Sequence, residues 1–206
     1  MKKSKISVNT IAGLAIITAI VVVLQLVGSQ IRFGPFSISL VLIPIVVGAA
    51  LYGPLAGAWL GFVFSVIVLI MDSAAFMAIN AAGTVVLVLL KGTLAGLCAG
   101  LVYGLFKKWA FIFKNLETGK EGWQINLGVV LAAIVCPVVN TGIFLLGCAA
   151  FFLPTIREWG AGAGYTNVVA YMFLGLVGGN FLVELLINLI LSPVIVQLIR
   201  IGRRRH

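Results

Sequence analysis

The sequence predicts an all-α membrane protein with six transmembrane helices and both termini in the cytoplasm. Of its 206 residues, 62% are hydrophobic and only 9% are charged, and the mean hydropathy is +1.23. Soluble domains are about half apolar and about a quarter charged. This composition excludes a soluble globular enzyme, a disordered segment and a nucleic-acid-binding module, and it indicates a single domain embedded in lipid.

The apolar stretches give the elements in order. A helix that crosses the hydrocarbon core needs about 20 mostly apolar residues. The first stretch is too long for the apolar region of a signal peptide, so we expect a retained helix. Gly53-Pro54 separates a short second span from the third, because this pair ends helices. The predicted spans are residues 6–27, 37–51, 55–71, 81–106, 125–152 and 167–199.

The basic residues predict the orientation of these spans. They gather before the first span, in the one long polar loop and at the C-terminus, whereas the other side carries only Arg32 and Arg157. Cytoplasmic loops carry the excess of Lys and Arg, so both termini are expected inside, in agreement with an even number of spans. The basic C-terminus could also touch anionic lipid. The inner residues are Lys2, Lys3, Lys5, Lys107, Lys108, Lys114, Lys120, Arg200, Arg203, Arg204 and Arg205.

Small residues recur at every fourth position in three of the predicted spans. In lipid, such stripes let helix backbones approach closely. Packing within the chain explains any one stripe, and contact with a partner protein is the alternative. Ala15 and Ala19 are the preferred docking pair, because a terminal helix is free to present one face outward. The other stripes are Gly57, Gly61 and Ser65, and Gly92, Gly96, Gly100 and Gly104.

Two charged residues, Lys91 and Glu184, fall within predicted spans, where a charge is costly and is a functional hypothesis by default. Each lies 16 residues before a basic residue at the inner end, Lys107 and Arg200 respectively. Both charges are therefore expected at a similar depth, about 24 Å from the inner ends. Two interpretations remain open: a structural ion pair, or a pocket in which Lys91 meets an anionic ligand and Glu184 orients it.

Other polar side chains occur at comparable depth. Asn140 and Thr141 follow Pro137, and Asn180 shares one helix face with Glu184 and Asn188. Hydrogen bonds between helices explain each of them singly, but three spans together suggest a cavity. The outer loops add residues that could form a lid or vestibule: Arg32, Phe36, Asp72, Arg157, Glu158 and Tyr165. The predicted binding residues are Lys91, Asn140, Thr141, Asn180, Glu184, Arg32 and Phe36.

Catalytic and energy-coupling motifs are missing from the sequence. It has no GxxxxGK[ST], HExxH or GxSxG, and it carries five acidic residues and a single His, the last residue. We therefore expect no catalytic residue, no metal site and no cofactor in this chain. A small bundle with a pocket and no energy source suggests a binding subunit that is driven by another protein.

Several segments resemble the substrate-binding S components of energy-coupling factor (ECF) vitamin transporters. They are the stretch from Ile43 to Gly61 with its Leu-Tyr-Gly-Pro turn, the Leu90-Lys91-Gly92 run, and the run from Pro137 to Gly142. Ala15-Ile-Ile-Thr-Ala19 matches the AxxxA motif that members carry in the first helix. The resemblance covers nearly the whole chain.

This resemblance implies a vitamin or related micronutrient bound at the outer side of a bacterial cytoplasmic membrane. The pocket of such proteins is built from the first outer loop and the fourth to sixth helices. It also implies a transmembrane scaffold subunit, which Ala15 and Ala19 would contact, and two cytoplasmic ATPase subunits that use the ATP. The whole S component is thought to topple in the membrane and carry its ligand inward.

The substrate and two alternative functions stay open. Lys91 as a counter-charge gives a weak preference for a compact anionic vitamin such as pantothenate, a preference that dissolves if Glu184 neutralises Lys91. One alternative is a structural six-span scaffold protein, which would use the small-residue faces without a pocket. The other is a stand-alone secondary carrier or channel.

Overall fold

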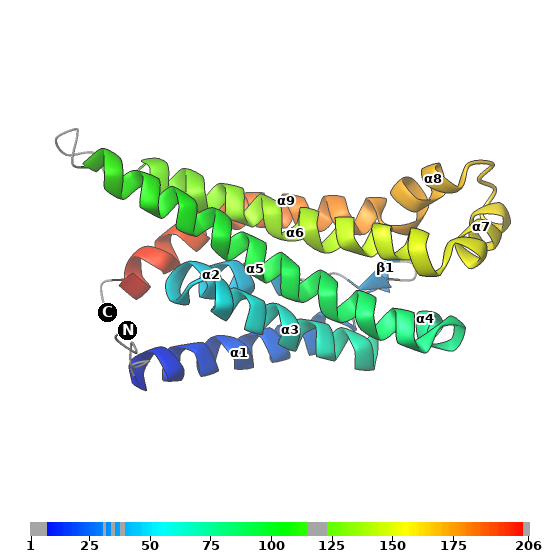
Figure 1. Ribbon diagram of the computed structural model, residues 1–206, viewed down its shortest axis with the longest axis horizontal. Helices are drawn as coiled ribbons and strands as arrows, with labels where there is room; N and C mark the ends of the chain where they lie inside the picture. Colours follow the sequence, from blue (N-terminus) through cyan, green and yellow to red (C-terminus); the bar gives the residue numbers. More distant parts are fainter. Residues whose placement is uncertain (1–7, 31, 34–35, 38–39, 115–122, 204–206) are drawn as a thin grey trace.

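The computed structural model describes residues 8–30, 32–33, 36–37, 40–114 and 123–203. Five helices in this part of the chain are long and apolar enough to cross a membrane, and they run roughly along the longest axis of the molecule (Figure 1). The first of them begins and the last ends at the same end of the bundle, which we call the terminal end. These helices are α1 (Val8–Gly28), α3 (Pro54–Met71), α5 (Ala81–Lys114), α6 (Trp123–Phe151) and α9 (Gly178–Arg203).

The predicted second span is shorter in the structure. Two antiparallel two-residue strands, β1 (Arg32–Phe33) and β2 (Phe36–Ser37), precede the 11-residue helix α2 (Leu42–Tyr52). At 1.5 Å per residue α2 rises about 16 Å, roughly half of a hydrocarbon core. Most of its side chains are buried inside the bundle. The described residues thus hold five candidate spans and this short buried helix, and the sixth span stays a prediction.

The turn between α2 and α3 forms where the sequence predicts it. Gly53 separates the two helices with φ of 97°, a left-handed conformation that favours glycine. Pro54 then occupies the first position of α3, where a missing backbone N–H is tolerated. The Gly-Pro pair therefore reverses the chain at the terminal end.

The predicted last span, residues 167–199, is divided into α8 (Val168–Ala170), the π-helix η1 (Tyr171–Leu176) and α9. The backbone N–H of Val177 donates to the Met172 carbonyl at 3.3 Å, five residues back. The Tyr171 ring lies over Gly175, where a Cβ would come within 2.6 Å of its Cδ2. The glycine and the ring together explain the altered winding, just before the helix turn that carries the polar residues of α9.

Two short helices that the sequence did not predict lie at the opposite end of the bundle: α4 (Ala74–Ile79) and α7 (Leu153–Gly162). The Phe76 ring of α4 packs edge-on against the rings of Phe144, Phe152 and Trp159, with centroids 5.1 to 5.6 Å apart. Such aromatic contacts add to the burial of apolar area. Helix α4 is thereby fixed across this end of the bundle.

The small-residue stripes of α3 and α5 meet face to face, and we call this contact the glycine seam (Gly57, Gly61, Gly92 and Gly96). A Cβ on Gly96 would collide with the Gly57 carbonyl oxygen, and a Cβ on Gly61 with that of Gly92. The two backbones therefore touch, as stripes of small residues permit in lipid. The packing of these stripes is within the chain.

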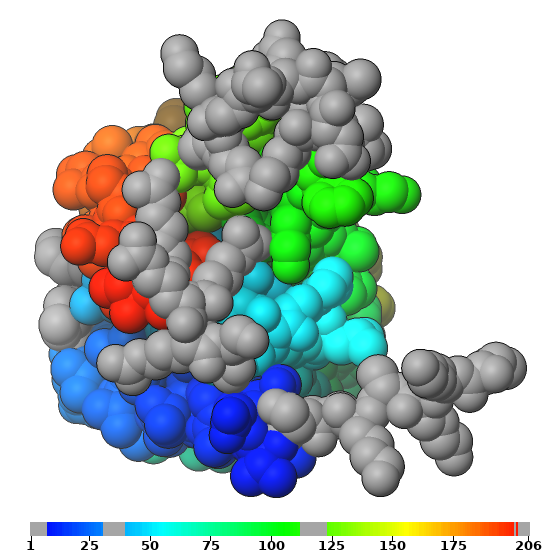
Figure 2. Space-filling view, turned by 90° about the vertical axis from the view of Figure 1, so that its left-hand side faces the viewer, coloured from blue at the N-terminus to red at the C-terminus, as the bar shows by residue number. Residues whose placement is uncertain are grey.

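Helix α1 lies at the edge of the bundle, as the view onto the terminal end shows (Figure 2). Its buried residues are Val21, Gln25 and Gly28, a narrow stripe that faces the other helices. Ala15 and Ala19 are exposed. The outward face of α1 is thus open to lipid or to another protein.

Candidate functional site

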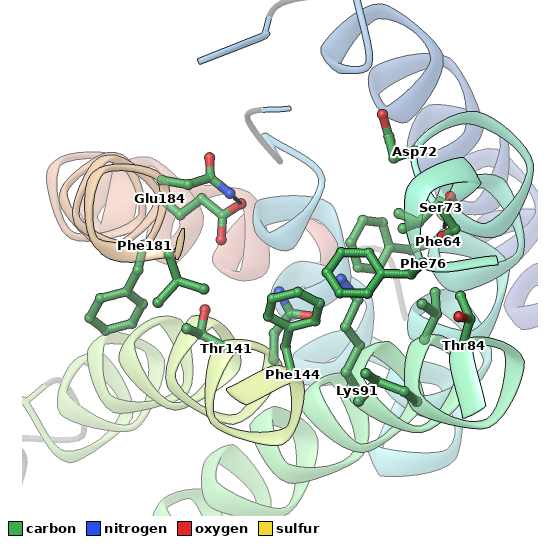
Figure 3. A pocket seen from close by; sticks show the side chains of 16 residues that line it. Phe64, Asp72, Ser73, Phe76, Thr84, Lys91, Thr141, Phe144, Phe181 and Glu184 are labelled. Carbon is green, nitrogen blue, oxygen red and sulfur yellow. Dashed lines mark hydrogen bonds between the residues drawn. The ribbon is translucent and has the colours of Figure 1, made fainter. Parts of the chain in front are cut away.

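A cavity of about 70 Å³ lies in the half of the bundle away from the terminal end, where α3, α4, α5, α6 and α9 converge (Figure 3). It is smaller than the roughly 300 to 1,000 Å³ typical of sites for drug-sized ligands. A ligand of vitamin size would need movement of the lining side chains or of α4. The lining residues are Phe64, Val68, Asp72, Ser73, Phe76, Thr84, Leu87, Val88, Lys91, Asn140, Thr141, Phe144, Val177, Asn180, Phe181 and Glu184.

Helical spacing explains why these residues meet. Thr84, Val88 and Lys91 repeat at intervals of four and three, so one face of α5 supplies them all. The same spacing brings Asn180 and Glu184 to one face of α9. The cavity is the place where the polar faces of separate helices point at one another.

Lys91 reaches the cavity from α5 and is half-buried. Its Nζ lies 5.0 Å from the centroid of the Phe144 ring, within the range of a cation–π interaction. Glu184 lines the same cavity from α9. The two charges therefore attract each other across one pocket, which is compatible with both interpretations drawn from the sequence.

Glu184 is 2% exposed, and its position is fixed by neighbours one helical turn away on each side. The Nδ2 of Asn180 donates to its Oε1 at 3.2 Å. The Nδ2 of Asn188 donates to its backbone carbonyl at 2.8 Å. The sequence predicted that these three residues share one polar face of the helix. In the structure they form one hydrogen-bonded row, and Asn180 and Glu184 line the cavity.

Asp72 follows the last turn of α3 and brings a third charge to the cavity. Its Oδ2 accepts hydrogen bonds from Ser29 Oγ at 2.9 Å and from Gln25 Nε2 at 3.2 Å. Both donors lie at the end of α1 and are at most 3% exposed. We call Gln25, Ser29 and Asp72 the α1 latch, because their hydrogen bonds tie the C-terminal end of α1 to the wall of the cavity.

Two side-chain oxygens at the cavity have no hydrogen-bond partner in the described structure: Asn140 Oδ1 and Asn180 Oδ1. Asn140 is 6% exposed. A buried acceptor without a donor costs about 1 to 3 kcal/mol. Such groups in a native protein call for an explanation, and a bound ligand is one.

The structure brings together five of the seven predicted binding residues: Lys91, Asn140, Thr141, Asn180 and Glu184 all line the cavity. The side chains of Arg32 and Phe36 lie outside the described residues. That any of these residues binds a ligand, and that Ala15 and Ala19 dock a partner, stay predictions. Among the residues described, no group of three or more His, Cys, Asp or Glu could hold a metal ion.

Sequence reasoning missed the aromatic wall and the contribution of α3 and α4. Phe64, Phe76, Phe144 and Phe181 line the cavity, and Asp72 had been assigned only to an outer vestibule. Phenylalanine in an apolar span looks the same whether it faces lipid or a pocket. A usable signal existed on α5, because the helical face of Lys91 continues toward the start of the helix through Val88 to Thr84.

These features define an integral membrane protein with a polar, aromatic-walled pocket inside its helix bundle. The sequence model of the family described as ECF transporter, substrate-specific component, matches residues 9–196. The chain therefore belongs to the family of substrate-specific components of ECF transporters. Members bind substrate for a transporter and work with scaffold and ATPase subunits. No curated protein and no solved structure matches the chain.

Proposed function

We propose that this chain captures a water-soluble vitamin or related micronutrient at the outer face of the bacterial cytoplasmic membrane for ATP-driven uptake. The observation that carries the proposal is the cavity, in which three charged side chains and two amides meet inside an apolar bundle. A structural scaffold protein has no need of such a pocket. Polar groups at membrane depth are costly and mark substrate sites.

The proposal places the cavity toward the outside. Lys107 and Lys108 lie on the part of α5 near the terminal end, and basic residues favour the cytoplasmic side. The chain runs along the bundle once more through the hairpin and α2, so six passes with both termini inside are compatible with five long helices. The cavity would then open away from the cytoplasm.

The energy would come from partners. The chain has no P-loop motif, so ATP would be bound by two cytoplasmic ATPase subunits and transmitted through a transmembrane scaffold. The exposed pair Ala15 and Ala19 on α1 supports a docking face, since small residues allow another helix to approach closely. The chain itself would hold no cofactor.

Reconstitution tests this function. We expect the chain to accumulate its substrate in liposomes only together with scaffold, ATPases and ATP, and to retain substrate when purified alone. Sustained uphill uptake by the lone chain would favour the secondary carrier. Absence of any bound or bindable small molecule would favour the structural scaffold. Mass spectrometry of the co-purified molecule would identify the substrate.

The docking face has its own test. Ala15→Trp combined with Ala19→Trp should abolish ATP-dependent uptake and leave substrate affinity unchanged, because the bulky rings keep the partner helix away. The matched control is Leu101→Trp with Leu105→Trp, an equally spaced exposed pair on α5. Equal loss of uptake in both variants, or loss of affinity in the first, would contradict the docking role.

Pantothenate is the substrate that the sequence favoured, on the strength of Lys91 as a counter-charge. Lys91 does line the cavity, which supports a charged ligand. Glu184 and Asp72 line it too, and both weigh against an anion. The sign of the ligand's charge is therefore the next question.

A further inference from the structure

The uncharged polar groups of the cavity restrict its ligand, whatever the sign of the ligand's charge. Asn140 on α6 is 6% exposed, and its Oδ1 has no hydrogen-bond partner in the described structure. The Oδ1 of Asn180 on α9 lacks a partner there too. Both residues line the cavity. Two helices therefore each bring an unpaired hydrogen-bond acceptor to the same pocket.

The orientation of the Asn180 amide follows from its neighbour on α9. Its Nδ2 donates to Glu184 Oε1 at 3.2 Å, one helical turn away. Turning the amide over would place its oxygen against a carboxyl oxygen and lose this hydrogen bond. The Asn180 oxygen is therefore the atom of this amide that is left for a ligand.

Two hydroxyl groups that line the cavity are directed elsewhere. Ser73 Oγ donates to the Val68 carbonyl at 3.0 Å, and Thr84 Oγ1 donates to the Asn80 carbonyl at 2.8 Å. Neither proton is thus available to the unpaired amide oxygens. Because a buried acceptor without a donor is unfavourable, these oxygens call for donors from outside the chain.

Phenylalanine rings line the cavity from four different helices. Phe64 of α3 and Phe76 of α4 lie across the cavity from Phe181 of α9 (Figure 3). Phe76 also packs edge-on against Phe144 of α6, with ring centroids 5.6 Å apart, which holds both rings in place. A flat ring gains from stacking on such faces beyond the burial of its area, and a saturated chain does not.

We propose that the ligand is built on a flat ring whose edge carries at least two hydrogen-bond donors, N–H or O–H. Asn140 and Asn180 accept these donors, and the phenylalanine rings pack against the faces of the ring. In a cavity of about 70 Å³, a compact ring requires less movement of the wall than a long chain. This inference rests on the proposed function and narrows its substrate to one class. It weighs against pantothenate, which is an open chain.

Matched probes on the purified full-length chain in detergent test the donors and the ring separately. Nicotinamide, pyridoxine and riboflavin carry donors on flat rings. Methyl nicotinate, 3-O-methylpyridoxine and 3-methylriboflavin are their analogues with one donor group removed, and pantothenate carries its donors on an open chain. We expect at least one donor-bearing ring to raise the thermal midpoint. It should bind at least about tenfold more tightly than its analogue and than pantothenate.

Three results would overturn the inference. The first is that pantothenate binds as tightly as the donor-bearing rings. The second is that each analogue binds as tightly as its parent. The third is that the molecule that co-purifies with the chain, identified by mass spectrometry, has no flat ring with hydrogen-bond donors.

Asn140→Leu tests the acceptor. It should weaken binding of the donor-bearing ring about tenfold and change binding of the analogue much less, so that the preference between the two falls toward one. This preference is informative even if the substitution alters stability. The control is Asn126→Leu, on the same helix outside the cavity, which should keep the preference. An unchanged preference in Asn140→Leu would contradict the role of Asn140.

Phe181→Leu tests the aromatic wall. It should weaken binding of the flat ring about twofold to tenfold, because stacking on the Phe181 ring is lost. The control is Phe173→Leu, which replaces a ring that is 57% exposed and lies outside the cavity, and it should leave the affinity unchanged. Equal affinities in the two variants would show that Phe181 does not stack on the ligand.

The outcomes separate this inference from the proposed function. If pantothenate or another open-chain molecule binds and is accumulated with scaffold, ATPases and ATP, the transport function stands and the inference about the ring fails. If no probe binds and the complete complex accumulates none of them, both fail.

Discussion

Lys91 and Gly92 are neighbours on α5, yet they belong to two opposite kinds of environment. From Lys91 toward its N-terminus, the helix lines a polar cavity together with four other elements. From Gly92 toward its C-terminus, its backbone contacts that of α3 in the glycine seam. The seam depends on side chains that are absent, and the cavity depends on side chains that are costly to bury. The seam thus supports the fold, whereas the cavity keeps polar groups whose burial lowers stability, a cost that the proposed binding role would explain.

The largest effect is expected in the seam. Gly96→Leu should lower the free energy of unfolding by at least about 3 kcal/mol, because the new side chain meets the backbone of Gly57, which cannot move aside as a side chain could. Thermal unfolding in detergent measures it. Gly104→Leu is the control on the same stripe, since nothing lies within 4 Å of a Cβ at that position. Similar loss in both variants would refute the seam as a special contact.

A smaller effect is expected in the cavity, where a substitution should weaken ligand binding without lowering stability. Asn140→Leu removes a buried acceptor without a partner, so stability should stay constant or rise by up to about 1 kcal/mol. Ligand affinity should fall about tenfold to a hundredfold, because the acceptor for the ligand is lost. Isothermal titration with the co-purified ligand and thermal unfolding measure the two. Asn126→Leu, on the same helix outside the cavity, should leave affinity unchanged. If Asn140→Leu lowers stability and leaves ligand affinity intact, Asn140 supports the fold and does not bind the ligand.

The smallest effect is expected at the α1 latch, which borders both regions. Ser29→Ala removes a hydrogen bond to the Asp72 carboxylate and should cost about 1 to 2 kcal/mol. Ser73→Ala is matched in burial, at 3% exposed, but its hydroxyl donates to a neutral carbonyl, that of Val68, so the loss should be smaller. Urea or thermal unfolding ranks them. A larger loss of stability in Ser73→Ala than in Ser29→Ala would show that the hydrogen bond from Ser29 to Asp72 contributes little to stability.

Much of this protein could be predicted from the sequence alone. Four features follow from local properties: membrane insertion, the bounds of α1, α3 and α6 to within two residues, the Gly53-Pro54 turn and the close packing of glycine stripes. In lipid every backbone polar group must be satisfied within the helix, so length and hydropathy suffice to find a span. The two charged residues within predicted spans indicated the cavity, because a charged side chain at that depth is rare.

Other features depended on tertiary contacts. Helix α2 is apolar because the bundle surrounds it, and hydropathy cannot distinguish a protein interior from lipid. The partner of each glycine stripe and the position of α4 beside the cavity depend on contacts between segments that lie far apart in the sequence. Above all, the sequence paired Lys91 only with Glu184, whereas the folded chain places both in one cavity with Asp72 and four phenylalanine rings. Hydropathy is a property of one segment, but the charge of a pocket is a sum over helix faces that only the fold brings together.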